Sequence, residues 1–168
     1  VKTLSNRLNL KINFESIATH KLSETMQALS EITNIDWLVL GWNGRAYNGI
    51  FFNNPIGWIV SHINSNFALF KCNGVMRFNK VLLAIRPNSR DTVKLIETTN
   101  KLCKYYNAEF TLLHVVPADM SSEQVNNIKL KANDLLKGTK GNLLLVPSET
   151  PIDTVSDLTA EHDLLVIG

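Results

Sequence analysis

The sequence predicts an α/β protein with mostly parallel sheets flanked by helices, and two observations lead to this fold class. Short apolar runs of strand length recur along the chain, and most are apolar at consecutive positions, which is typical of strands covered on both faces. Segments with helical spacing alternate with these runs, as in βαβ units. The runs are residues 8–12, 37–40, 67–70, 81–85, 110–116, 143–146 and 164–167.

Helices are predicted where apolar residues recur three or four positions apart. Before the second run these residues are Leu22, Met26, Leu29 and Ile32. Before the fifth run they are Val93, Ile96, Leu102 and Cys103. Such spacing places the apolar side chains on one helix face, which can pack against a sheet.

Side-chain oxygens suitable for capping stand where two of the helices should begin. Asn88, Ser89 and Asp91 offer such oxygens just before Val93. Ser121, Ser122 and Glu123 form a plausible first turn for a later helix. Local chemistry and apolar spacing therefore predict the same division of the chain.

Composition limits both the size of the fold and the kind of partner. The 168 residues, 45% hydrophobic and 19% charged, are enough for one good core or two small ones, and they exclude a disordered or fibrous chain. The formal charge is +2, with both signs interspersed, so no single-sign patch points to nucleic acid as a partner.

The cysteines and the apolar runs bear on compartment. Cys72 and Cys103 are far apart and have no metal-ligand spacing, which argues against a disulfide framework or a zinc site and favours a reduced, cytoplasmic compartment. A membrane span needs roughly 18 to 20 apolar residues in a row, and no run approaches that length. The first residues lack the layout of a signal peptide, so we expect no direct membrane insertion.

An internal repeat is the most informative feature of the sequence. Residues 9–16 through 36–41 and residues 142–149 through 163–168 both follow the order strand, helix, strand begun by aspartate, glycine. The helix of the second copy, around 154–162, is the shorter one. The alternative is that any helix followed by a parallel strand looks alike at this level. The repeat predicts two related units, 1–75 and 76–168.

Residues 36–45, 56–63 and 67–71, followed by a fresh strand at 78–85, resemble the end of one universal stress protein domain and the start of the next. The stretch 108–116 resembles the second strand of that family. The resemblance implies an adenine-nucleotide α-hydrolase-like fold, with 1–75 as the C-terminal part of a first repeat and 76–168 as the N-terminal part of a second. Family domains have five strands, so both repeats would be incomplete.

Two explanations are open for why both repeats would be incomplete. Either the sequence is trimmed or further residues are disordered, or the halves combine into a circularly permuted unit. The chain stops at Gly168, where a glycine loop should begin, and this favours the first explanation.

The tandem frame and the turn Gly41-Trp42-Asn43-Gly44 are also similar to the cytosolic tails of amino-acid permeases, cation–chloride cotransporters and antiporters. This resemblance implies a regulatory or assembly module at the cytosolic face of a membrane, preceded by a transporter membrane domain in the full-length chain and forming a homodimer. The loop aromatics Trp42, Tyr47, Phe51, Phe52 and Trp58 either seal an interface or pack within their own loop.

A degenerate nucleotide site is the candidate binding site. A glycine turn between a strand and a helix can bind phosphate through converging N–H groups, and Gly41 and Gly44 stand at such a turn. The family pattern continues with nine residues, then glycine and serine or threonine, but here Asn54 and Pro55 occupy those places. Proline has no N–H to donate, so the affinity for phosphate should be weak or absent. The exception would be a shift of the loop that brings Gly57 to the place of the missing glycine.

The nucleoside side of that site also departs from the family. The family aspartate after the first strand is replaced by Arg86, which cannot accept hydrogen bonds from ribose hydroxyls. Val115 and Val116 stand where the second strand of the family ends near the adenine, although core packing is the stronger interpretation for both. The predicted site is therefore Gly41, Gly44, Asn54, Gly57, Arg86 and Val116, with ATP, ADP or AMP bound weakly if at all.

We expect neither catalysis nor a resident metal. His20, His62, His114 and His162 have no metal-ligand spacing, and no nucleophile or Walker motif is present. His114 lies in an apolar run and is predicted to be a core residue. A stand-alone protein that binds adenine nucleotides is the alternative function, and a nucleotidyl-transfer enzyme on a related fold is the third.

Overall fold

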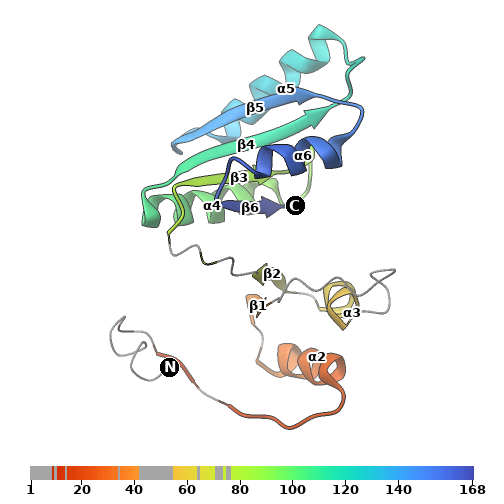
Figure 1. Ribbon diagram of the computed structural model, residues 1–168, viewed down its shortest axis with the longest axis vertical. Helices are drawn as coiled ribbons and strands as arrows, with labels where there is room; N and C mark the ends of the chain where they lie inside the picture. Colours follow the sequence, from red (N-terminus) through yellow and green to blue (C-terminus); the bar gives the residue numbers. More distant parts are fainter. Residues whose placement is uncertain are drawn as a thin grey trace. The chain divides into compact units, whose positions relative to one another are not determined.

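A computed structural model describes Asn9 and residues 11–13, 15–33, 35–41, 55–63, 65–70, 74 and 77–168. The chain divides into two compact units, Val1–Asn73 and Gly74–Gly168. Figure 1 shows the helices and strands of each unit.

The first unit contains a pair of parallel strands, β1 (Trp37–Gly41) and β2 (Asn66–Phe70). Helix α2 (Leu22–Thr33) precedes β1, and helix α3 (Pro55–His62) lies between the two strands and contacts α2. The backbone and side-chain N–H groups of Asn66 both donate to the Asp36 carbonyl, at 3.1 and 2.7 Å. The strands predicted at 37–40 and 67–70 are confirmed.

The strand predicted at 8–12 is wrong for the residues that the structure describes there. Asn9 lies in a turn with a φ of 51°, and Lys11 and Ile12 lie outside any strand. An apolar run forms a strand only where a neighbour satisfies its N–H and carbonyl groups, and β1 and β2 pair with each other. The two copies of the predicted repeat thus share a helix followed by a strand, and the tandem repeat is not confirmed.

The second unit is built on a four-stranded parallel sheet in the order β5-β4-β3-β6. Its strands and helices alternate along the chain: β3 (Lys80–Ala84), α4 (Thr92–Tyr106), β4 (Glu109–Val116), α5 (Ser122–Leu135), β5 (Gly141–Pro147), α6 (Pro151–Thr159) and β6 (Leu164–Ile167). The predicted α/β class with mostly parallel strands and flanking helices is confirmed.

The helices of this unit cover both faces of the sheet (Figure 1). Val81 and Leu83 of β3 pack with Ile96 of α4 and Ala132 of α5 on one face. Leu82 and Ala84 of β3 pack on the other face with residues of α6. Because successive strand residues point to opposite faces, covering both faces requires apolar residues at consecutive positions. This arrangement accounts for the unbroken apolar run at 81–85.

The N-terminal cap of α5 forms as its sequence predicts. The Ser121 hydroxyl accepts from the Gln124 backbone N–H, and the Gln124 side chain accepts from the Ser121 N–H. This reciprocal pair is a capping box, which satisfies two N–H groups that the helix itself leaves open.

The predicted cap of α4 is wrong. Asp91 is the N-cap residue, but its φ of −95° and ψ of 9° lie outside the extended region of capping residues, and its side chain makes no capping hydrogen bond. Instead the Thr92 hydroxyl donates to the Ser89 carbonyl at 2.8 Å. Within the described residues, the N–H groups of Val93 and Lys94 have no hydrogen-bond partner.

Asp163 joins the start of β6 to the start of β3. Its carboxylate accepts from the backbone N–H groups of Asn79 and Lys80, at 2.7 and 3.0 Å, and its own N–H donates to the Lys80 carbonyl. Because these two N–H groups stabilise the ionised form, they hold the pKa of Asp163 below its usual value.

We expect Asp163→Asn to lower the melting temperature, because one carboxylate oxygen accepts both hydrogen bonds and a neutral amide oxygen is a weaker acceptor than an ionised one. The lowered pKa in the folded state means that the stabilisation is present above the unfolded pKa of about 3.9 and is lost as pH falls through the folded pKa. The difference in melting temperature from the unaltered protein should therefore shrink below about pH 4. Asp157→Asn, on exposed α6, is the control and should change little.

Truncation of the central strand should be costly. Leu83 is fully buried between β3 and the α4 and α5 layer, so Leu83→Ala should lower the free energy of unfolding by about 2 to 5 kcal/mol in urea denaturation. Leu130, 70% exposed on α5, is the matched control, and Leu130→Ala should stay within about 0.5 kcal/mol. Equal losses for the two variants would contradict the described core.

Candidate functional site

The strand order of the second unit creates a crevice at one edge of its sheet. From β3 the chain passes through α4 and α5 to β4 and β5 on one side, and then returns through α6 to β6 on the other side. The helices of these two directions cover opposite faces. In open parallel sheets, ligands bind outside the carboxyl ends of the strands where the direction reverses, which here is between β3 and β6.

A cavity of about 720 Å³ lies at this place. Its walls are the ends of β3, β4 and β6, the residues that follow β3, and the first turns of α6. Val115, Val155 and Ile167 supply apolar surface, and Ile152 projects from α6 with 84% of its surface exposed. The volume falls within the usual range for small-molecule sites.

Arg86 gives the cavity its polar character. It follows β3, it is exposed, and its guanidinium is the one charged or polar side chain among the described residues that line the cavity. A guanidinium binds carboxylate or phosphate, and the apolar walls suit a flat organic body. No lining side chain in the described chain can accept a hydrogen bond or act as a general base.

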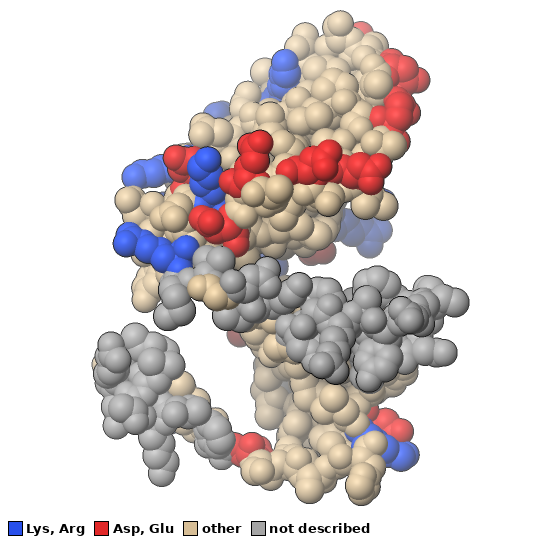
Figure 2. All heavy atoms as spheres, in the orientation of Figure 1, with Lys and Arg blue, Asp and Glu red and all other residues tan. Residues whose placement is uncertain are grey.

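Acidic residues lie on α6, the helix that forms one wall of this cavity. Asp153 lies in the first turn of α6 and Asp157 lies one turn later. Figure 2 shows acidic side chains over α6, with lysine and arginine side chains elsewhere on the same face. Negative charge next to the cavity disfavours a highly charged anion such as a triphosphate.

The structure distributes the predicted site residues over both units. Gly41 and Gly57 lie in the first unit and Arg86 and Val116 in the second, whereas Gly44 and Asn54 lie outside the described residues. Of these, Arg86 lines the cavity.

The two described glycines lie at the ends of regular elements. Gly41 is the last residue of β1, and among the described residues no atom beyond its chain neighbours lies within 4 Å of the position that a Cβ would occupy there. Gly57 lies in the first turn of α3, where its carbonyl accepts from the Ser61 hydroxyl at 3.0 Å. The connection between them, residues 42–54, lies outside the described part of the chain.

Val115, and not Val116, lines the cavity. Val115 packs with Leu113 on the face that α6 covers, and Val116 by alternation shares the other face with Leu112 and His114. The sequence correctly predicts where the strand ends. Which of its last residues points toward the cavity depends on which helices cover each face of the sheet.

Several cavity residues were missed by sequence reasoning. Pro151, Ile152 and Val155 begin α6, and they look like ordinary helix-start and core residues. The available signal was position, because a helix that begins just after a parallel strand lies at the carboxyl edge of the sheet.

His114 is buried on the face opposite α6, with 3% of its surface exposed. Its Nδ1 lies 2.8 Å from the Ile85 carbonyl oxygen. A carbonyl can only accept, so Nδ1 carries the proton and Nε2 of the neutral ring is an acceptor. Burial lowers the pKa of His114, and the hydrogen bond to Ile85 partly opposes this shift.

Neither a metal-binding cluster nor a membrane-spanning helix occurs in the part of the chain that the structure describes. No group of three or more His, Cys, Asp or Glu side chains there is arranged to hold a metal ion. No helix there has both the length and the apolar character needed to cross a bilayer.

Comparison with known protein families finds no match, and no curated protein matches the chain. Among solved structures, the chain is similar to the crystal structure of protein Rv1636 from Mycobacterium tuberculosis H37Rv, at 14% sequence identity and a TM-score of 0.41. The match covers 56% of this chain and 74% of that chain. The fold and the cavity define the class of the second unit as an α/β protein with a cavity at the carboxyl edge of a parallel sheet.

We expect His114 to titrate below the usual imidazole pKa of about 6.5 in an NMR titration. Since the unfolded chain takes up this proton at a higher pH than the folded chain, the free energy of unfolding should fall as pH drops from about 6.5 to the folded pKa. His114→Asn should remove this pH dependence, because its amide can donate to the Ile85 carbonyl but does not titrate. A pH dependence that persists unchanged in this variant would contradict the assignment.

Proposed function

We propose that the chain is a non-catalytic regulatory or assembly module of a membrane transporter of the amino-acid, cation–chloride or antiporter type. In this proposal its second unit holds a degenerate nucleotide site. The observation that supports this proposal is the cavity at the carboxyl edge of the sheet, where Arg86 lies among apolar walls. Catalysis of acyl or phosphoryl transfer calls for a positioned base or nucleophile, and the described lining supplies neither. Such a cavity is suited to binding and sensing.

The transporter setting is supported by the sequence, through the tandem frame and the turn at Gly41 and Gly44. An assembly role is supported by exposed apolar residues of β1 and β2 in the first unit, among them Val39 at 62% exposure. Parallel strands are normally covered on both faces. We therefore propose that the protein forms a homodimer at the cytosolic side of the membrane.

A stand-alone protein that binds adenine nucleotides is the second candidate. The position and volume of the cavity favour it, and Arg86 could pair with a phosphate. The described lining has no side-chain acceptor for ribose hydroxyls, and Asp153 follows the lining residue Ile152 in the first turn of α6. These features favour weak or absent nucleotide binding.

Thermal-shift titration with ATP, ADP and AMP, together with mass by light scattering, separates the two candidates. The transporter module predicts a dimer mass and no saturable shift. A ligand present at 100 times its Kd would stabilise the folded state by about 2.7 kcal/mol, so binding would be plainly visible.

A saturable rise in melting temperature would instead favour the nucleotide-binding protein. In that case Arg86→Met should abolish the rise if the cavity is the binding place. Arg90→Met is the matched control, because Arg90 is an exposed arginine nearby that does not line the cavity.

A further inference from the structure

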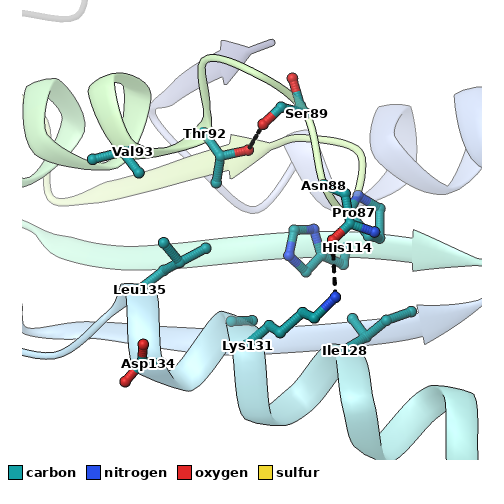
Figure 3. Close-up of a pocket in the computed structure, with 11 residues that line it drawn as sticks. Pro87, Asn88, Ser89, Thr92, Val93, His114, Ile128, Lys131, Asp134 and Leu135 are labelled. Atoms are coloured by element: carbon teal, nitrogen blue, oxygen red, sulfur yellow. Dashed lines mark hydrogen bonds between the residues drawn. The ribbon is translucent and has the colours of Figure 1, made fainter.

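A second cavity, of about 350 Å³, lies on the other face of the same unit. It is bounded by the turn after β3, the start of α4, the end of β4 and the second half of α5 (Figure 3). Figure 3 shows the His114 imidazole among the side chains of Asn88, Thr92, Lys131 and Leu135. Arg86, which characterises the first cavity, does not line this one.

The wall of this cavity contains an unpartnered hydrogen-bond acceptor. His114 has 3% of its surface exposed, and its Nδ1–H donates to the Ile85 carbonyl. No other hydrogen bond joins its ring to the described residues, which leaves the Nε2 lone pair free. Nε2 is not among the fully buried side-chain atoms that lack a partner, so it opens onto the cavity, where a bound N–H or O–H donor can replace water as its partner.

Positive potential surrounds the same cavity. The Lys131 ammonium reaches the Asn88 side-chain oxygen at 3.5 Å, the long contact drawn as a dashed line in Figure 3. Val93 also lines the cavity, and the N–H groups of Val93 and Lys94 at the start of α4 have no partner among the described residues. Open N–H groups at the positive end of a helix dipole attract anions.

The one carboxylate in the lining does not cancel this potential. Asp134 accepts a hydrogen bond from the Lys137 ammonium at 2.6 Å, so its charge is offset by a partner outside the cavity. In Figure 3 its carboxylate points away from Lys131. Ser89 and Thr92 add hydroxyl groups to the lining, and the Thr92 hydroxyl donates to the Ser89 carbonyl. The apolar part of the wall consists of Pro87, Val93, Ile128, Ala132 and Leu135.

We propose that this cavity binds a small amphiphilic acid with a flat apolar body, one N–H or O–H donor and one carboxylate. The donor meets His114 Nε2, the body packs on Ile128 and Leu135, and the carboxylate lies toward Lys131 and the start of α4. This site is separate from the Arg86 cavity and does not depend on the proposed transporter role.

The test is an NMR titration of the ¹⁵N-labelled protein with indole-3-acetate, which carries both an N–H donor and a carboxylate. Saturable binding should move the His114 Nε2 resonance and the amide resonances of Val93 and Lys94. Two probes of matched shape separate the contacts: 1-methylindole-3-acetate lacks the donor, and tryptamine replaces the carboxylate with an ammonium. Each should bind about tenfold more weakly or worse, as expected for loss of one hydrogen bond or ion pair.

Variants test the same contacts from the protein side. Lys131→Met should weaken indole-3-acetate about tenfold, whereas Lys129→Met, which removes an exposed lysine of α5 outside the cavity, should not. His114→Asn keeps a donor for the Ile85 carbonyl but removes Nε2. This variant should therefore bind indole-3-acetate and 1-methylindole-3-acetate with equal affinity. The methylated probe tests this contact in the unaltered protein, and the result therefore does not depend on that variant folding.

The proposal is overturned if no probe binds saturably at millimolar concentration, if tryptamine binds as well as the acid, or if the resonances that move surround Arg86. It is also overturned if Lys129→Met weakens binding as much as Lys131→Met, because net charge alone would then explain the effect. The nucleotide titration reports on the other cavity, so failure of either proposal is recognised independently.

Discussion

The structure of the second unit depends on the burial of β3 on both faces. Parallel hydrogen bonds join this strand to β4 on one side and to β6 on the other. Its side chains alternate between a core formed with α4 and α5 and a core formed with α6. A strand with two covered faces fixes where three helices must pack, and thereby where the sheet changes direction.

Both cavities follow from that arrangement. The crevice beside Arg86 opens where the connections on the two sides of β3 separate. The cavity beside His114 is lined by the start of α4, the second half of α5 and the end of β4. Leu113 and Val115 face one cavity and His114 faces the other, because neighbouring strand residues point to opposite faces. One strand end therefore contributes to two sites of different chemistry.

The two cavities differ in the ligand that each would favour. The first offers a guanidinium among apolar walls, next to an acidic helix, which suits a weakly charged ligand. The second combines an ammonium, open helix N–H groups and a neutral imidazole acceptor. Among the described lining residues, the first cavity holds no hydroxyl, imidazole or carboxylate side chain, whereas the second holds the hydroxyls of Ser89 and Thr92 and the imidazole of His114.

The sequence by itself determined the class of fold, the strands of the second unit and the capping of α5, because these depend on local spacing and local hydrogen bonds. It also marked Arg86 as a binding candidate. Only the tertiary structure decided that residues 11 and 12 lie outside a strand, that Asp91 leaves α4 uncapped and that Val115 rather than Val116 lines the cavity. The missing cap depends on the backbone conformation of Asp91, which lies outside the extended region. The first and last of these outcomes depend on neighbours distant in sequence, namely a pairing strand and the helix that covers a given face. Local pattern carries no information about such neighbours.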